Sequence, residues 1–353
     1  MQDSERTLRS MLEGMVNGVL VTNAENVITF MNQSSERILG STSHKWKGKE
    51  ITTISLPSEL VEMIQESKRQ NLSLRREIMF YFPKEQAINV HVKPIFDTHQ
   101  QFGGIILVLH DMTEIRKLER MRSEFVANVS HELKTPLASV KGFAETLLVS
   151  GLEDREIAKS FLQIIFDESD RLNRLIGDIM ELSKIESGKA PMNFSPIELS
   201  SFLRKTIEIM ITQADQKNIT LELFAADNLW IEADEDRLHQ IMINLLSNSI
   251  KYTPENGKVK VAAEILTEEQ QQEQMQITVI DTGIGIPKKD LPRIFERFYR
   301  VDKARSRNSG GTGLGLSIVK HLVEQHKGNI RIESKEDFGT RIIIELPVVH
   351  EER

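Results

Sequence analysis

Residues 130–136 read Ser-His-Glu-Leu-Lys-Thr-Pro, and the chain around them has helical periodicity from about residue 113 to residue 187. Two long helical segments are separated by a turn at 150–154. Apolar residues recur along both segments at coiled-coil spacing; they are Ile115, Leu118, Met121, Phe125 and Val129 in the first segment, and Ile165, Leu172, Leu175, Ile179 and Leu182 in the second. An antiparallel helical hairpin has only one apolar seam to bury, so we expect two copies of the chain to form a four-helix bundle.

The quoted stretch also places a histidine beside a carboxylate. Adjacent helix residues splay by about 100°, so His131 is expected to point away from the apolar seam while Glu132 lies beside it. A carboxylate near an exposed imidazole can accept the proton of one ring nitrogen and leave the other nucleophilic. A solvated surface histidine next to a glutamate is the competing interpretation. Pro136 removes a backbone N–H inside the helix, which predicts a kink one turn after His131.

Residues 1–112 read as short strands with short helices between them. The runs at 19–22 and 27–30 predict a hairpin, and a short helix at 34–39 is expected to end at Gly40. Three further strands are predicted, at 75–82, 88–96 and 104–110. An antiparallel sheet with helices on one face accounts for this order, so an α+β domain is expected.

Residues 192–350 alternate helices and strands. Helices are predicted at 199–215, 235–252 and 317–326, and strands at 220–224, 258–265, 276–281, 329–334 and 340–346. In the second of these helices Asn244, Asn248 and Lys251 share one face, because they are four and three residues apart. Two amides and an ammonium group are costly to bury without a ligand, and they suit a hard cation and a phosphate. A polar face in water is the alternative.

Two glycine-rich stretches lie in the same part of the chain. Asp281-Thr282-Gly283-Ile284-Gly285 follows an apolar strand, where a carboxylate can accept the hydrogen bond of an exocyclic amine. The second stretch, 310–315, leads into a helix, and backbone N–H groups at a helix start can hold phosphate. Its spacing is neither that of a Rossmann fingerprint nor that of a P-loop. An ordinary strand turn and a flexible linker remain the alternatives.

The composition restricts the class of protein. The chain has 353 residues, of which 39% are hydrophobic and 27% charged, which predicts two or three globular domains. It has no cysteine, so disulfides, thiolate catalysis and cysteine-bound metal are excluded. The net charge of −7 gives no reason to expect nucleic-acid binding. No apolar run is long enough to span a bilayer, so a cytoplasmic protein, or the cytoplasmic part of a membrane-anchored sensor, is expected.

The order of the motifs is more specific than any one of them. His-Glu-x-x-Thr-Pro is followed by Asn-x-x-x-Asn-x-x-Lys-Tyr, Asp-x-Gly-x-Gly, Phe-Glu-Arg-Phe, Gly-x-Gly-x-Gly and Phe-Gly-Thr. This arrangement, over residues from about 113 to 347, resembles the sensor histidine kinases of two-component systems. Residues 1–112 resemble a PAS sensor domain less specifically. The residues within the motifs are most similar to those of the Gram-positive phosphate-response or cell-wall sensor kinases.

The resemblance implies a multidomain α+β protein: a PAS-like domain at 1–112, a dimerisation and histidine phosphotransfer hairpin at 113–187, and an ATP-binding sandwich at 192–350. His131 would accept the γ-phosphoryl group, Glu132 would activate it, and Thr135 would orient a water molecule for a reverse, phosphatase reaction. The family's nucleotide-binding positions fall on Asn244, Asn248, Lys251, Tyr252, Asp281, Gly283, Gly285, Gly311, Gly313, Leu314 and Gly315. Among them, Asn248 would ligate Mg²⁺.

The implied function is a histidine kinase that uses ATP and Mg²⁺, acts as a homodimer, and passes its phosphoryl group to an aspartate of a cognate response regulator. His131 lies more than 100 residues from the ATP motifs, so the resemblance implies a large domain movement, with a hinge near 187–191. Two other functions compete: an ATPase of the wider gyrase-like group, and a non-catalytic scaffold built on the sensor domain and coiled coil.

Overall fold

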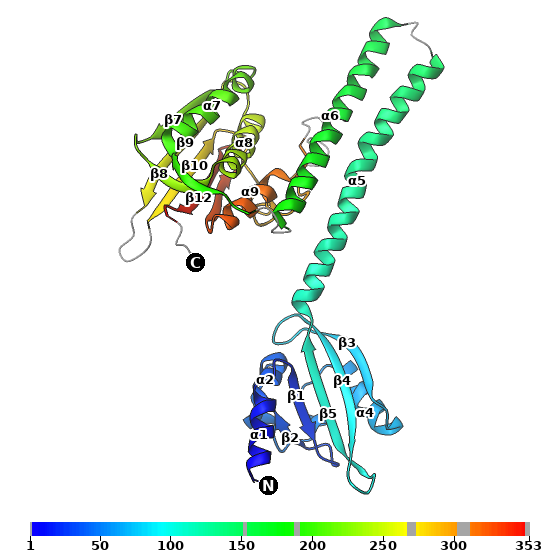
Figure 1. Ribbon diagram of the computed structural model, residues 1–353. Coiled ribbons are helices and arrows are strands. Elements are labelled where there is room, and N and C mark those ends of the chain that lie inside the picture. Colours follow the sequence, from blue (N-terminus) through cyan, green and yellow to red (C-terminus); the bar gives the residue numbers. More distant parts are fainter. Residues whose placement is uncertain (1, 151–153, 187–190, 267–272, 302–310, 350–353) are drawn as a thin grey trace. The chain divides into compact units, whose positions relative to one another are not determined.

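The computed structural model of the protein describes residues 2–150, 154–186, 191–266, 273–301 and 311–349 (Figure 1). The chain forms two compact units, Met1–Val126 and Ala127–Arg353. Most of the predicted turn at 150–154, most of the predicted hinge at 187–191 and the first residue of the second glycine-rich stretch, Gly310, lie outside the described residues. None of the described helices is both long and apolar enough to cross a membrane.

The first unit is built on an antiparallel sheet in the order β2-β1-β5-β4-β3. Its strands are β1 (Gly18–Thr22), β2 (Ile28–Met31), β3 (Leu74–Phe80), β4 (Gln86–Phe96) and β5 (Phe102–Asp111). The predicted hairpin, β1 with β2, is confirmed. The strand predicted at 75–82 ends earlier, because Phe80 already pairs with Gln86 and the residues between them form the turn.

The helices of the first unit are α1 (Gln2–Glu13), α2 (Gln33–Leu39), α3 (Ser43–Trp46) and α4 (Ser58–Gln70). Helix α2 ends at Gly40, as predicted, and the φ angle of this glycine is 66°. Helices α1 and α4 were not singled out in the sequence. Helix α2 packs on β1 and α4 packs on β3 and β4, so that one continuous apolar core forms; its largest fully buried side chains include Leu20, Ile28, Leu60, Met63, Ile78, Phe80, Ile88, Ile105, Leu107 and Leu109.

Helix α5 (Thr113–Ser150) begins directly after β5. Asp111 joins the two elements, because one carboxylate oxygen accepts from the Thr113 N–H at 2.9 Å and the other from Gln86 Nε2 at 2.9 Å. One turn into the helix, Arg116 forms a bidentate ion pair with Glu77 on the edge strand β3. The start of α5 is therefore tied to the sheet from both β4 and β3.

Helices α5 and α6 (Arg155–Glu186) have the limits expected of the predicted hairpin. Asp154 caps α6 by accepting from the N–H groups of Glu156 and Ile157. Helix α5 continues without a break through Pro136. Among the apolar residues noted in the second helical segment, Leu175 and Leu182 are buried. Among those of the first segment, Ile115, Leu118 and Met121 are exposed in the single chain. Apolar surface of this kind remains available for another helix.

The rest of the second unit contains a five-stranded sheet in the order β11-β12-β10-β9-β7, in which β7 and β9 are parallel and the other pairs antiparallel. The strands are β7 (Thr220–Ala225), β9 (Lys258–Leu266), β10 (Gln274–Asp281), β11 (Asn329–Lys335) and β12 (Gly339–Pro347). Helices α7 (Leu199–Asp215) and α8 (Glu235–Tyr252) have the predicted limits, and α9 (Gly315–Gln325) begins two residues before its prediction. A second sheet, β6 (Phe194–Glu198) with β8 (Trp230–Asp234), was missed. The expected multidomain α+β architecture is confirmed.

Candidate functional site

Helix α8 separates an apolar from a polar face. Asp234 caps the helix, since its Oδ1 atom accepts a hydrogen bond from the Arg237 N–H at 3.1 Å. The apolar side chains are buried in the unit's core; they are Leu238, Ile241, Met242, Leu245, Leu246 and Ile250. Asn244, Asn248 and Lys251 lie away from this core and are half-buried. The helix therefore presents two amides and one ammonium group on the side that is not packed on the sheet.

The second glycine-rich stretch lies against this polar face. A Cβ atom at Gly311 would be 2.6 Å from the Nζ atom of Lys251, and a Cβ atom at Gly315 would be 3.0 Å from Oδ1 of Asn244. Only glycine leaves this space open. Residues predicted from two separate motifs are thus brought together, although these two pairs are 60 and 71 residues apart in sequence.

The backbone between these two glycines has a specific conformation. Gly313 has a φ angle of 75°, and its carbonyl accepts a hydrogen bond from the Phe298 N–H at 2.9 Å. A Cβ atom at Gly313 would lie 2.9 Å from the Phe298 Cα atom. Leu314 is fully buried and anchors the start of α9. The first N–H groups of α9 are therefore held beside the polar face of α8, where they can donate to an anion.

Asp281 ends β10 as a buried carboxylate. Its Oδ1 atom accepts from the N–H groups of Gly283 at 2.9 Å and Thr340 at 3.2 Å, and its Oδ2 atom accepts from Ser249 Oγ at 3.2 Å. Burial raises the pKa of Asp281 above its ordinary value, although these hydrogen bonds act in the opposite direction. A carboxylate has about four lone-pair positions, so Oδ2 retains capacity for a further donor.

The glycines after Asp281 permit close backbone packing. A Cβ atom at Gly283 would lie 2.7 Å from Asp281 Oδ1 and 2.8 Å from the carbonyl oxygen of Tyr252. Gly285 has a φ angle of 68°, and a Cβ atom there would collide with the carbonyl of Lys335. Both glycines are required by this geometry. Gly283 brings the end of β10 against Tyr252, the last residue of α8, and Gly285 brings the following loop against the end of β11.

Several cations surround Lys251. The pKa of Lys251 is lowered to about 8, first by burial and then by the positive charges of Arg300, Arg174 and Lys217. Its Nζ atom also lies 5.0 Å from the centre of the Tyr252 ring. A group of positive charges that repel one another suits a polyphosphate. Arg300 lies two residues after the Phe-Glu-Arg-Phe motif, whereas no motif marked Arg174, which comes from α6.

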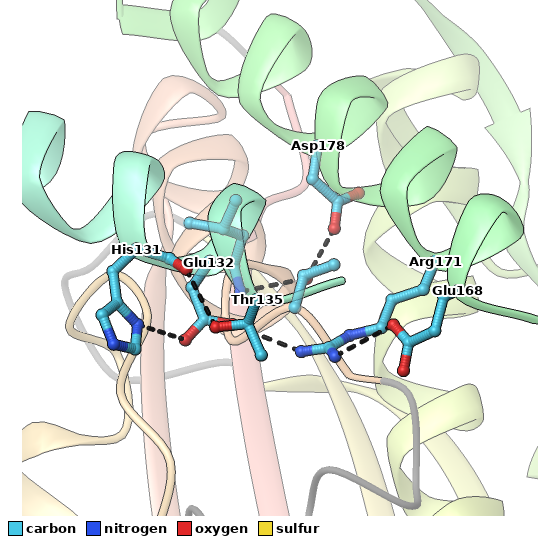
Figure 2. Close-up of polar contacts among 8 residues, drawn as sticks. His131, Glu132, Thr135, Glu168, Arg171 and Asp178 are labelled. Atoms are coloured by element: carbon cyan, nitrogen blue, oxygen red, sulfur yellow. Dashed lines mark hydrogen bonds and ion pairs between the residues drawn. The ribbon is translucent and has the colours of Figure 1, made fainter. Parts of the chain in front are cut away.

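His131 lies on α5 with 77% of its side chain exposed (Figure 2). Its Nδ1 atom faces Oε1 of Glu132 at 4.0 Å, which is beyond hydrogen-bonding distance. The other oxygen of Glu132 accepts from Arg171 at 3.3 Å, and Arg171 also pairs with Glu168 at 3.5 Å. The predicted pair is therefore adjacent, but Glu132 is engaged by an arginine that sequence reasoning did not identify.

Thr135 is one turn after His131 and is also exposed. Its hydroxyl donates a hydrogen bond to the backbone carbonyl of His131 at 3.2 Å (Figure 2). This is the back-bonding that threonine often makes in helices. The oxygen still has lone pairs with which to accept a hydrogen bond.

The second half of α6 contacts the part of the unit that carries the glycine-rich loop. Thr312, between Gly311 and Gly313, donates to Asp178 at 2.6 Å. Glu181 pairs with Arg237 and Glu186 with Arg297. Leu182 and Ile185 are buried nearby, and α6 packs on α9. These contacts were not predicted, because no motif connects the hairpin to the loop.

Three known families match consecutive parts of the chain. Residues 16–114 match the PAS domain, residues 121–188 match the "His Kinase A (phospho-acceptor) domain", and residues 233–350 match the "Histidine kinase-, DNA gyrase B-, and HSP90-like ATPase". The last match implies the use of ATP, and the second implies dimerisation.

The chain is 34% identical over 354 residues to "Sensor histidine kinase WalK" of Bacillus subtilis, covering 99% of this chain and 57% of that protein. It is 35% identical over 349 residues to a "Sensor protein kinase WalK" of Staphylococcus aureus, covering 98% of this chain and 82% of that one. The chain thus spans little more than half the length of the Bacillus relative. The solved structure of histidine kinase ThkA, in complex with response regulator protein TrrA, has the same fold; it is 24% identical, with a TM-score of 0.52, and covers 96% of this chain and 98% of that one. The chain belongs to the sensor histidine kinases of two-component systems.

Proposed function

We propose that this chain transfers the γ-phosphoryl group of ATP to His131, passes it to an aspartate of a response regulator, and also removes it from that regulator. One observation carries the proposal. The polar face of α8, the glycine-rich loop and Asp281 converge on one side of the second unit, in a chain that also exposes a histidine beside a carboxylate.

The nucleotide site is assigned residue by residue. Asp281 accepts a hydrogen bond from the exocyclic amine of adenine, and Gly283 and Gly285 allow the close backbone packing that shapes the loop beside the base. Lys251 contacts phosphate and Tyr252 lines the pocket. Gly311, Gly313, Leu314 and Gly315 form the phosphate-facing loop and helix start.

The donor set also fits Mg²⁺. Asn248 offers an amide oxygen, with Asn244 one turn away, and Mg²⁺ usually binds to few protein ligands together with phosphates and water. When bound, the ion neutralises charge on the phosphates. The space left open by Gly311 and Gly315 beside Lys251 and Asn244 is consistent with a bound polyphosphate.

The phosphoryl acceptor is the Nε2 atom of His131, because Nδ1 is the ring nitrogen that faces Glu132. A bond forms between Nε2 and the γ-phosphorus, the bond to the bridging oxygen breaks, and ADP leaves. Glu132 takes the proton from Nδ1, so that the phosphorylated ring does not carry an additional positive charge. This requires Glu132 to move closer to Nδ1 and to loosen its contact with Arg171.

The chain is proposed to divide at 1–112, 113–187 and 192–350, with a hinge near 187–191 that lets the ATP-binding domain reach His131. The exposed apolar residues of α5, among them Leu118 and Met121, would be covered by a second copy in a four-helix bundle. Transfer onward to the regulator, and its reversal, need chiefly in-line positioning of the reacting atoms.

The test is to incubate four proteins with radiolabelled ATP: the unmodified chain, His131→Gln, Asn248→Asp and a control variant, His99→Gln. The unmodified chain should acquire label that acid removes and base does not, as expected of phosphohistidine. His131→Gln should bind ATP but remain unlabelled. Asn248→Asp should remain folded and dimeric, yet unlabelled. His99→Gln, which changes another exposed histidine, should be labelled normally.

Acid-labile label on His131→Gln would assign the acceptor to another histidine. Hydrolysis of ATP without any protein label would favour a gyrase-like ATPase instead. Absence of both nucleotide binding and label would leave the scaffold function.

A further inference from the structure

The C-terminal end of α8 is a place where backbone carbonyls need partners from elsewhere. The last four carbonyl groups of a helix have no N–H partner within it, and leaving them buried and unpaired is costly. In α8 these residues include Lys251 and Tyr252, which carry side chains of the proposed nucleotide site. The groups that donate to these carbonyls therefore also position the backbone from which the side chains of Lys251 and Tyr252 extend.

One distant side chain holds three carbonyls at this end. The Nζ atom of Lys217 donates hydrogen bonds to the carbonyl oxygens of Lys251 at 2.7 Å, Ile250 at 3.0 Å and Thr253 at 3.1 Å. An ammonium group has three N–H donors, so these bonds use all of them. The side chain is half-buried, in the turn between α7 and β7.

The remaining carbonyls of this end have other partners. The Ser249 carbonyl accepts from the N–H of Thr253 at 3.0 Å and from its hydroxyl at 2.7 Å. The Tyr252 carbonyl accepts from the Ile284 N–H at 3.2 Å, in the loop after Asp281. Lys217 is itself fixed, because its carbonyl accepts from the Asn256 N–H at 3.1 Å. Each carbonyl from 249 to 253 is thus paired, and Lys217 supplies most of the partners.

We infer that Lys217 is a positioning residue for the phosphate contact of the nucleotide site, acting through the backbone of Lys251. This inference rests on the proposed function, since it assigns Lys251 to phosphate. Lys217 bonds to the backbone of Lys251 and its neighbours, and in this way fixes the base of the side chain that reaches Gly311.

The charge of Lys217 suits this position. A cation at a helix C-terminus meets the negative end of the helix dipole, and hydrogen bonds from a charged donor are stronger than those between neutral groups. The same charge repels the ammonium group of Lys251 and contributes to lowering its pKa. A neutral residue of the same length would keep the packing, but it would lose the three hydrogen bonds.

The experiment measures binding of Mg²⁺–ADP and of adenosine to the full chain by calorimetry. It compares the unmodified chain with Lys217→Met, Lys251→Met and the double variant. Lys217→Met should lower the affinity for ADP by about tenfold, as loss of charged hydrogen bonds predicts, and should change adenosine binding much less. In the Lys251→Met background, Lys217→Met should have little further effect on ADP. Lys205→Met, which removes an exposed lysine from α7, should bind both ligands normally.

A purely structural role gives a different pattern. In that case Lys217→Met lowers the melting temperature and weakens the binding of ADP and of adenosine equally, or its effect on ADP binding adds fully to that of Lys251→Met. Either result overturns the inference. If Lys217→Met does not fold, Lys217→Gln replaces it, because glutamine keeps an N–H donor without the charge. The ratio of ADP affinity to adenosine affinity in this variant should lie between the ratios expected of the unmodified chain and of Lys217→Met. An unchanged ratio overturns the inference. Failure of the unmodified chain to bind ADP would overturn the proposed function itself.

Discussion

The hydroxyl of Thr312 donates a 2.6 Å hydrogen bond to Asp178, which is 134 residues earlier in the chain. Thr312 lies in the glycine-rich loop, and Asp178 lies on α6 of the phosphoacceptor hairpin. Burial raises the pKa of Asp178, so its charged form is held at some cost. The bond fastens the loop to a helix from which the ATP-binding domain must separate if it is to reach His131.

Asp178→Ala removes this attachment. A hydrogen bond to a charged group contributes up to a few kcal/mol, so autophosphorylation should rise by up to about tenfold when separation limits the rate. The initial rate of labelling by radiolabelled ATP measures the effect. Asp167→Ala, which removes an exposed carboxylate from the same helix, is the control. A rate that falls in Asp178→Ala alone would mean that the contact belongs to the active arrangement.

If Lys251 contacts phosphate as proposed, the affinity for nucleotide should depend on pH. Its pKa is about 8 instead of 10.5, so the side chain is charged at pH 7 and mostly neutral above pH 9. The affinity for ADP should therefore decrease as the pH rises through about 8, and calorimetry across this range measures the decrease. Lys251→Met should lose this dependence. An equal decrease in that variant would assign the titration to another group.

The same shift has an opposite effect on stability. Between pH 8 and 10.5 the folded chain binds fewer protons at Lys251 than the unfolded chain does. The contribution of this group to the free energy of unfolding therefore increases as the pH rises through this window.

Asn32 is a fully buried amide that uses all of its hydrogen-bonding positions. Its oxygen accepts from the N–H groups of Val19 and Ser35, and its nitrogen donates to the carbonyls of Leu12 and Asn17. Asn32→Ala removes the cap of α2 and leaves buried backbone groups unpaired, so the free energy of unfolding of the first unit should fall by about 2–5 kcal/mol.

Urea unfolding followed by Trp46 fluorescence measures this loss, in a Trp230→Phe background that leaves one tryptophan. Asn89→Ala, which removes an amide with one bond to Arg75, is the matched control. If both variants lost the same stability, the buried network would have no special role.

Pro136→Ala tests whether α5 bends. Alanine restores an N–H that can bond to the carbonyl of Glu132, and proline costs about 3 kcal/mol in a helix interior relative to alanine. The variant should favour the straight helix. The ratio of kinase to phosphatase activity should therefore change by several-fold, in favour of the activity that the straight helix supports. Glu145→Ala, further along the helix, should leave the ratio unchanged. An unaltered ratio in Pro136→Ala would contradict a bending mechanism.

Thr135→Ala distinguishes a catalytic from a structural hydroxyl. The bond from Thr135 to the His131 carbonyl is the structural arrangement, yet the oxygen can also accept a hydrogen bond from a water molecule. If it orients water, the variant should retain near-normal autophosphorylation and dephosphorylate the regulator about tenfold or more slowly. The decay of phosphorylated regulator with ADP present measures this step. Wild-type decay would remove Thr135 from the site.

Helices α7 and α8 could be predicted to the residue, because each has a strong apolar period and a clear end. The strands β6 and β8 were missed, since five residues containing Pro196 or Glu232 show no period that distinguishes them from a loop. Among the site residues, those carried by motifs were predictable. Arg171, Asp178 and Lys217 were not, because each acts through a partner at least 33 residues away that only the folded chain brings near.

The buried carboxylate of Asp281 would also select among nucleotides. Adenine carries an amino group at its six position, which can donate a hydrogen bond to a carboxylate, whereas guanine carries an oxygen there. Two acceptors facing each other in a buried place leave both unpaired, and sites built on such a pairing reject the wrong ligand strongly. If ATP binds as proposed, the carboxylate that the glycines pack so closely also makes the kinase selective for ATP over GTP in the cell.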